Sequence, residues 1–311
     1  MSGKAFEELN LIDNFLFGVA LGHEVHGPLI AKTILETILQ REVKIRNINP
    51  EKTLFPPKPD LHGVRLDAYI EEGAIDVCPG DIFNLEPEKE GRKKKHLPKR
   101  SRFYHSRIDG HNLKSGQPYT ALPTTWVIFI TSFDPFGKNR MVYTIRNHCV
   151  ELPEMNYDDG AVTLFLYVHG KKGNAPKKLR EMLNYFSNTS RENACNSDLV
   201  SLQSCIDDIK TDPRIKEAYM DFDEFIQYER EEAAEEAIAE RNAAIADRDA
   251  AIAERDSAVA EKNTAIAERE TAIAEKNTAV ANLDTALLKI KELEAKLLHL
   301  QAAFDNMGQK K

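Results

Sequence analysis

The sequence predicts an α/β fold in which a mixed β-sheet is flanked by helices, followed by a long C-terminal helix. Strand-like apolar or alternating runs are interspersed with helical patterns over about the first 230 residues. The apolar fraction of 42 % is enough to fill an ordinary core. A seven-residue repeat without proline or glycine begins at Ala237. We therefore expect an α/β domain over residues 1–230 and a heptad-repeat helical stalk or coiled coil over residues 231–311.

Two helices are expected at the start of the chain. The segment NFLFGVALG (residues 14–22) forms the first, and PLIAKTILETILQ (residues 28–40) forms the second. In the second segment the large apolar residues fall near one helical face, and Pro28 suits a first helical position.

The next segments predict two strands that carry acidic residues. GVRLDAYIE (residues 63–71) alternates apolar and polar residues, which places Asp67 on the face opposite Leu66 and Ala68. DIFNLEP (residues 81–87) predicts a second short strand, separated from the first by a connection that ends in Pro-Gly. Because the two strands are close in sequence, we expect them to pair.

The remaining elements of the domain follow in order. A helix is expected from near Pro98 through Leu113, and helical patterns resume at Ala175 and continue to about Tyr228. The segment TTWVIFIT is apolar nearly throughout, as expected of a central strand covered on both faces. FDPFGKNR, which follows it, predicts a hairpin connection to the next strand. The three strands are expected at residues 124–131, 141–149 and 162–170.

The heptad repeat predicts a long helix with a weak apolar seam. Either assignment of the isoleucine column leaves the other core position to charged or amide residues. A conventional leucine-rich stripe returns between Leu287 and Leu300. The stalk is either an oligomerisation or spacer element or a tract expanded by tandem duplication. The partner expected for this helix is a second copy of the chain. The column consists of Ile238, Ile245, Ile252, Val259, Ile266, Ile273 and Val280.

Composition excludes several classes of protein. The four cysteines have no CxxC spacing, which argues against a zinc site or a disulfide framework. The N-terminal residues do not resemble a signal peptide, and no run of about eighteen apolar residues predicts a membrane span. We therefore expect a cytoplasmic protein. The net charge of -8 hides a strongly basic segment over residues 91–107, so it does not exclude a nucleic-acid partner.

The two acidic strands suggest a metal site. If the strands pair, Asp67 and Glu86 lie near one end of the sheet on one face, and Glu88 points to the same side as Glu86. A hard divalent cation such as Mg²⁺ prefers carboxylate oxygens and relieves the repulsion between adjacent acids. The spacing alone also fits ordinary solvated strand residues. The basic helix that follows favours the metal site, because cations beside an acid pair suit a phosphate backbone.

With these residues identified, the chain resembles the recombination-promoting nuclease and putative transposase family of the PD-(D/E)XK nuclease superfamily. The resemblance covers about residues 11–149 through an ordered set of motifs. They are IDNFLFGVAL, GVRLDAYIEE, IFNLEPE, LPKRSRFYHSRID and YTALPTTWVIFITSFDPFGKNRMVYTIRN. It implies a restriction-endonuclease-like core and Mg²⁺-dependent (or Mn²⁺-dependent) cleavage of DNA.

The resemblance also implies roles for individual residues. Asp67 and Glu86 match the metal-binding acids, and the backbone carbonyl of Pro87 is a further metal ligand. Glu88 stands where the family usually has Gln and the superfamily has Lys, so it departs from the pattern at a catalytic position. Asp13 matches a supporting acid on the first helix. The residues expected to contact DNA are Lys99, Arg100, Arg102, Tyr104 and Arg107.

Three possibilities remain open on this basis, and in the third the helical stalk carries the main function and the globular part anchors it. The first is a metal-dependent DNA endonuclease that uses Asp67, Glu86 and Glu88. The second keeps the fold without the chemistry, as a DNA-binding or assembly module joined to a coiled-coil oligomerisation arm. The departure at Glu88 is the sequence feature that keeps the second open.

Overall fold

The structure, a computed structural model, describes residues 4–55, 62–74, 80–89 and 91–308. Contacts between residues divide the chain into two units, Met1–Ile226 and Gln227–Lys311. The first unit contains the sheet and most of the helices, and the second is the C-terminal part of one long helix. The boundary falls at Ile226, close to the predicted boundary at residue 230. Residues 56–61 and 75–79, which include Cys78, lie outside the described residues.

The first unit is built on a six-stranded mixed sheet with the order β1-β2-β3-β4-β6-β5. The outer pairs β1·β2, β2·β3 and β5·β6 are antiparallel, and the central pairs β3·β4 and β4·β6 are parallel. The mixed sheet and the pairing of the two acidic strands are therefore confirmed. The strands are β1 (Ile45–Leu54), β2 (Val64–Glu72), β3 (Ile82–Glu88), β4 (Thr125–Thr131), β5 (Val142–Ile145) and β6 (Ala161–Tyr167).

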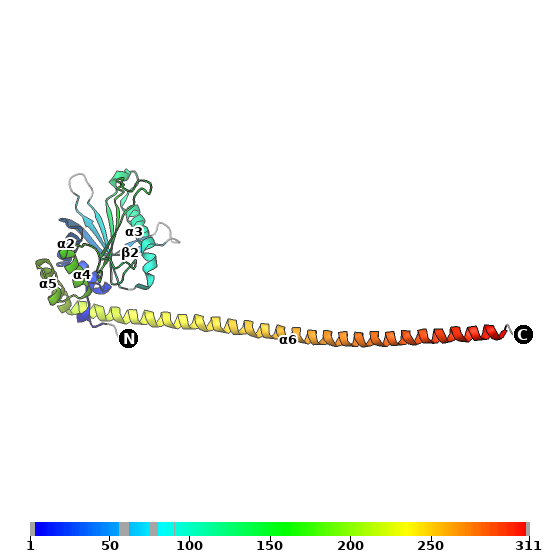
Figure 1. The fold of residues 1–311 in the computed structure, drawn as a ribbon. Helices are drawn as coiled ribbons and strands as arrows, with labels where there is room; N and C mark the ends of the chain where they lie inside the picture. Colours follow the sequence, from blue (N-terminus) through cyan, green and yellow to red (C-terminus); the bar gives the residue numbers. More distant parts are fainter. Residues whose placement is uncertain (1–3, 56–61, 75–79, 90, 309–311) are drawn as a thin grey trace. The chain divides into compact units, whose positions relative to one another are not determined.

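Helices cover both faces of this sheet (Figure 1). The apolar side chains of β3, β4 and β6 alternate between two buried clusters, as expected of central strands. The larger cluster packs under α1, α2, α4 and α5, and the smaller one packs under α3. The helices are α1 (Asn14–Gly22), α2 (Gly27–Leu39), α3 (Leu97–Asn112), α4 (Lys177–Ser187), α5 (Ser197–Thr211) and α6 (Pro213–Gly308).

The strands differ from the expected ones in three respects. Strand β1 was not predicted, because its residues are mostly polar and include Pro50, a residue that sheets accept mainly in edge strands such as this one. The predicted hairpin after β4 does not form, because β6 lies between β4 and β5 and pairs with both. The strand predicted at residues 141–149 is also shorter, since β5 ends at Ile145.

The apolar side chains of β2 do not all lie on one face of the sheet. Leu66 belongs to the cluster under α3, together with Tyr69, whereas Ala68 belongs to the cluster under α1 and α2. The alternation therefore changes phase beside Asp67. The same place interrupts the β1·β2 ladder, where the pair expected between Glu51 and Asp67 is missing and Glu51 has a left-handed φ of 51°.

Helix α6 contributes to both units. Its first fourteen residues, Pro213 to Ile226, belong to the first unit, where Tyr219 is buried against Phe6 and Phe15 and donates a hydrogen bond to the Lys4 carbonyl. In the second unit the helix is continuous through the heptad repeat, and the side chains described there are exposed. Among the described residues, no helix combines the length and the apolar character needed to cross a bilayer.

Candidate active site

The candidate site forms where strands β2 and β3 stop pairing. The β2·β3 ladder ends at the pair Ala68 and Leu85, one position before Asp67 and Glu86. The Asp67 N–H, which has no partner across the interrupted β1·β2 ladder, donates instead to Glu86 Oε1 at 3.1 Å. The Glu86 side chain therefore reaches the Asp67 backbone. This contact brings the two predicted acids together at one place on the sheet.

Glu86 is fully buried, and its carboxylate is saturated with hydrogen bonds. Oε1 accepts from the Asp67 N–H and from Asn84 Nδ2 at 3.0 Å. Oε2 accepts from Arg100 Nη2 at 2.5 Å and from the Tyr104 hydroxyl at 3.3 Å. A carboxylate has about four acceptor positions, so these donors fill them. Such a network can hold a charge in the interior because each oxygen is compensated.

Arg100 supplies the positive charge of this cluster. Its guanidinium bridges Glu86 and Glu88, with Nη1 at 2.9 Å from Glu88 Oε2. Its Nε donates to the Tyr104 hydroxyl at 2.7 Å, and the guanidinium lies 5.3 Å from the centres of the Tyr104 and Phe129 rings. Arg100 is therefore fixed by the acids and by two aromatic faces. Glu86 and Glu88 lie on one side of β3, as their spacing indicated.

The electrostatics of the cluster disfavour full ionisation of its acids. Burial, the nearby Glu86 carboxylate and, more weakly, Glu88 raise the pKa of Asp67 to about 7, although Arg100 and Arg65 oppose the shift. Burial also raises the pKa of Glu86, against the lowering effect of Arg100 and its hydrogen bonds. One guanidinium therefore does not fully compensate the three acids, and Asp67 holds a proton in part of the population at neutral pH.

Asp67 opens onto a cavity of about 660 Å³. The cavity is lined by α1, by the irregular part of β1 and β2, and by the start of α6. Phe15 and Phe222 give it aromatic walls, and Arg65 adds a cation beside Asp67. No hydrogen bond to the Asp67 carboxylate is found among the described residues, in contrast to Glu86. Asp67 is therefore the acid of the site whose oxygens are free to meet a ligand.

Two other residues with predicted metal roles are placed differently. Asp13 lies at the start of α1, where its carboxylate accepts from the Asn10 N–H at 2.8 Å and pairs with Lys4 and Lys89. Burial raises its pKa, but these partners outweigh burial and hold the pKa below its usual value. The Asp13 carboxylate is thus paired with lysines and is not part of the Glu86 cluster.

Pro87 occupies a position where the missing N–H of proline costs no hydrogen bond. Residues of β3 alternately direct their backbone groups towards β4 and β2, and the Glu88 carbonyl accepts from Ser132 on the β4 side. By this alternation the Pro87 carbonyl is directed towards β2. The β2·β3 ladder ends before this point, so the missing N–H of Pro87 leaves no bond unmade.

The basic residues of α3 separate into two groups. Arg100 and Tyr104 face the sheet and join the Glu86 cluster, and the Arg107 guanidinium donates to backbone carbonyls at Leu54 and Phe55. Lys99 and Arg102 lie on the exposed side of the helix. Of the five residues expected to contact DNA, these last two are the ones whose charges face solvent.

The chemistry of the acids fits a divalent metal, but their present contacts leave it little room. Carboxylate oxygens are the ligands that Mg²⁺ prefers, and the raised pKa of Asp67 reflects repulsion that a cation would relieve. Over the described ranges, however, no three or more His, Cys, Asp or Glu side chains are arranged to hold a metal ion. Asp67 and Glu88 have oxygens to offer, whereas Glu86 becomes a ligand only if Arg100 or Tyr104 releases it.

Sequence reasoning missed Asn84 as a supporting residue and Arg100 as a counter-ion. Asn84 is fully buried and precedes Glu86 by two positions, so both side chains lie on one face of β3. The available signal for Asn84 was an amide side chain between the apolar residues Phe83 and Leu85. Arg100 was noticed as a cation, but the sequence does not tell whether it faces the acids or solvent.

Comparisons of this chain with models of protein families, with curated proteins and with solved structures return no match.

Proposed function

We propose that this chain is a metal-dependent DNA endonuclease with a restriction-endonuclease-like core, of the recombination-promoting nuclease type. The observation that carries the proposal is the meeting of Asp67, Glu86 and Glu88 at the point where β2 and β3 separate. Acids that converge at the end of a pairing ladder, with Asp67 open to a cavity, suit phosphodiester hydrolysis.

Each residue of the site has a role in this proposal. A bound Mg²⁺ or Mn²⁺ supplies Lewis-acid activation of the phosphate and of a water nucleophile. Asp67 would hold the metal through its free oxygens, Glu88 would complete or orient the set, and Glu86 would contribute an oxygen only if Arg100 moved. The Pro87 carbonyl, directed towards β2, is a further oxygen donor. The released Arg100 guanidinium can then pair with a substrate phosphate, for which its planar fork is suited.

The DNA backbone is proposed to approach along α3. Lys99 and Arg102 present exposed charges on the helix that carries Arg100 and Tyr104. Such contacts supply affinity and position rather than sequence preference. We place this activity in the cytoplasm, in keeping with the free thiols of Cys149, Cys195 and Cys205.

A plasmid-nicking assay tests the nuclease. With Mg²⁺ the full chain should convert supercoiled DNA to open-circle or linear forms, and Asp67→Ala should lower the rate by at least about a hundredfold because the metal loses its accessible ligand. Glu154→Ala removes an exposed acid that lines neither site and serves as the matched control. Glu88→Gln should retain or increase turnover. Unchanged cleavage in Asp67→Ala would refute the assignment.

One observation favours a second function, a DNA-binding or assembly module without catalysis. The four donors around Glu86 form a complete network in which Arg100 already provides the compensating cation. If this network never opens, the cluster stabilises the fold and does not bind metal. The same nicking assay separates the two functions, because the module binds DNA and leaves it intact.

We also propose that α6 mediates self-association through its C-terminal part. Leucine and isoleucine side chains recur there at spacings of three and four residues, and all of them are exposed. Burying such a stripe against a second copy removes apolar surface from water. The stripe contains Leu283, Leu287, Ile290, Leu293, Leu297 and Leu300.

Lysine substitutions in the full chain test this stripe. Ile290→Lys with Leu297→Lys should shift the chain to monomer in sedimentation velocity, because each lysine would have to be buried at the paired surface. Ile245→Lys with Ile252→Lys is the matched control in the heptad repeat, where charged and amide residues flank the isoleucines. A chain that sediments as a monomer before any substitution, or a larger effect of the control pair, would contradict this role.

A further inference from the structure

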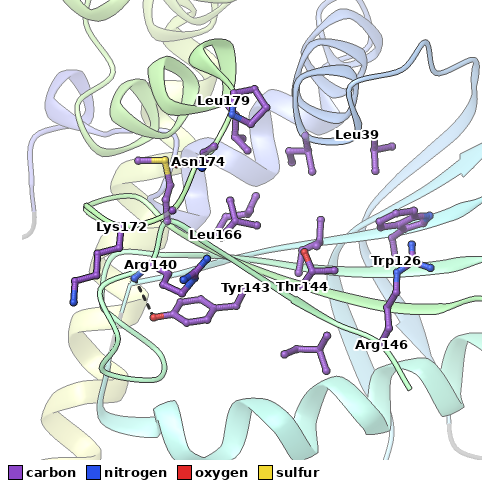
Figure 2. A pocket seen from close by; sticks show the side chains of 18 residues that line it. Leu39, Trp126, Arg140, Tyr143, Thr144, Arg146, Leu166, Lys172, Asn174 and Leu179 are labelled. Carbon is purple, nitrogen blue, oxygen red and sulfur yellow. Dashed lines mark hydrogen bonds between the residues drawn. The ribbon is translucent and has the colours of Figure 1, made fainter. Parts of the chain in front are cut away.

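A trough of about 690 Å³ lies beside the edge strand β5, on the face of the sheet that α2 and α4 cover (Figure 2). Its apolar floor includes Leu164 and Leu166 of β6, which belong to the core cluster under those helices. In the sheet register Thr144 pairs with Leu164 and Val142 pairs with Leu166, so these side chains share the floor. Glu86 and Arg100 belong to the α3 side, and the trough is therefore a separate site.

Every charged side chain that lines the trough is a cation. Every second residue from 140 to 146 shares one side of the β5 segment, in the order Arg140, Val142, Thr144, Arg146. The two arginines therefore lie at opposite ends of the floor. The third cation is Lys172. Six residues of extended chain span at most about 20 Å, so the Cα atoms of Arg140 and Arg146 lie up to that far apart.

Two cationic side chains lie at one end of the trough, and a backbone bridge holds their residues side by side. Arg140 and Lys172 form a β-bridge, and the Met141 N–H donates to the Lys172 carbonyl at 3.0 Å. Both side chains are exposed, and neither has a carboxylate partner in the part of the chain that the structure describes. Two unpaired cations held together suit a phosphate group. Pro176 and Leu179, at the start of α4, also line the trough.

The other end of the trough is aromatic. The guanidinium of Arg146 lies 5.8 Å from the centre of the Trp126 ring, and the two side chains lie side by side in Figure 2. The Trp126 indole N–H donates to Asp81 Oδ2 at 2.9 Å, which fixes the orientation of the ring. Asp81 is itself paired with Arg41, and the exposed Asp158 lies 4.0 Å from Arg146. A guanidinium that lies over an indole face can carry a nucleobase on its outer side, so the pair forms a stacking platform.

We propose that this trough binds a short single-stranded segment of nucleic acid. A phosphate lies between Arg140 and Lys172, the sugars cross the floor of Val142 and Thr144, and a base stacks at Trp126 and Arg146. Charge along a groove combined with an aromatic platform is the combination that single-strand binding uses. The distance between the two ends requires more than one nucleotide. The site goes beyond the proposed cleavage function and does not depend on it.

The fluorescence of Trp126 tests the proposal directly, since it is the only tryptophan of the chain. The full chain, in EDTA so that cleavage cannot occur, is titrated with a six-nucleotide oligothymidylate, and affinity is followed separately by the anisotropy of a labelled strand. Binding should quench the tryptophan emission in step with the anisotropy. Saturation of the anisotropy without a change in emission would show that the strand binds elsewhere, and would overturn the proposal.

Substitutions of exposed arginines test the site further. Arg140→Ala should weaken binding by about tenfold and lower the slope of log affinity against log salt by about 0.7. Arg191→Ala, which removes an exposed arginine elsewhere, should change affinity by less than twofold. Thermal denaturation verifies that both variants are folded. Equal weakening in the two variants would overturn the site.

Two competitors identify the ligand chemistry. Inorganic tripolyphosphate carries charge without a base, and thymidine monophosphate carries one base and one phosphate. Both should displace the labelled oligonucleotide at least about tenfold less well than the unlabelled strand. Equal displacement by tripolyphosphate would exclude the aromatic contact, and equal displacement by the mononucleotide would exclude an extended strand. Binding is measured in EDTA and nicking is measured with Mg²⁺, so the failure of this site and the failure of cleavage are distinguishable.

Discussion

Replacing Arg100 with methionine should destabilise the first unit by about 3–5 kcal/mol at pH 8, measured by urea denaturation in EDTA. The substitution keeps an apolar stem against Tyr104 and Phe129 but removes the cation that lies on Glu86. Glu86 is fully buried, so its charge would remain in the interior with only neutral donors. A loss of that size approaches the whole stability of many domains.

The pH dependence and a second substitution separate charge from packing. Because burial raises the pKa of Glu86, a carboxyl without Arg100 takes up a proton more readily, and the destabilisation should shrink at pH 5. Glu86→Gln in the same chain should recover most of the loss, since an amide needs no counter-ion. Arg102→Ala, on the exposed side of the same helix, should stay within about 0.5 kcal/mol. A cost below about 1 kcal/mol for Arg100→Met would refute the counter-ion role.

The same variant bears on metal binding without a cleavage assay. Two carboxylates that have lost their guanidinium attract a divalent cation more strongly. Added Mg²⁺ should therefore raise the melting temperature of Arg100→Met more than that of the unmodified chain. An equal response would indicate that Arg100 and the metal do not compete for these acids.

The sequence predicted most of the sheet because its central strands have strong apolar patterns. The strand TTWVIFIT lies between β3 and β6 with both faces covered, and that burial is what makes it apolar throughout. Strand β1 escaped prediction for the opposite reason. An edge strand with one side in solvent needs few apolar residues, and its pairing with β2 depends on long-range contacts that no local pattern encodes.

The acids of the site were predictable as a set, but their environment was not. Sequence spacing placed Glu86 and Glu88 on one side of β3, and Arg100 contacts both. The interruption at Glu51, where β1 and β2 lose a pair, frees the Asp67 N–H for Glu86. Glu51 gives no local signal of this, because a left-handed conformation at a glutamate arises from the surrounding packing.

The substitution Asp67→Asn should stabilise the unit above neutral pH. The folded-state pKa of Asp67 is about 7, above its usual value of about 3.9 in an unfolded chain. A carboxyl with a raised pKa contributes its full stability below the unfolded value, and that contribution is lost as the pH rises through the folded value. The unmodified chain should thus lose stability between about pH 4 and pH 7, whereas an amide at this position does not titrate.

The expected gain in stability follows from the width of the pH range between the unfolded and folded pKa values of Asp67. From pH 5 to pH 8, Asp67→Asn should gain about 2 kcal/mol relative to the unmodified chain, which allows for some solvent screening at the cavity. Urea denaturation in EDTA at both pH values gives this difference. Asp158→Asn is the control, because that acid is exposed and should give the same difference at both pH values. An Asp67→Asn variant that loses stability at pH 8 would mean that the ionised Asp67 carboxylate is held by favourable contacts. The three acids would then not repel one another, and the case for a cation shared between Asp67 and Glu86 would lose its electrostatic basis.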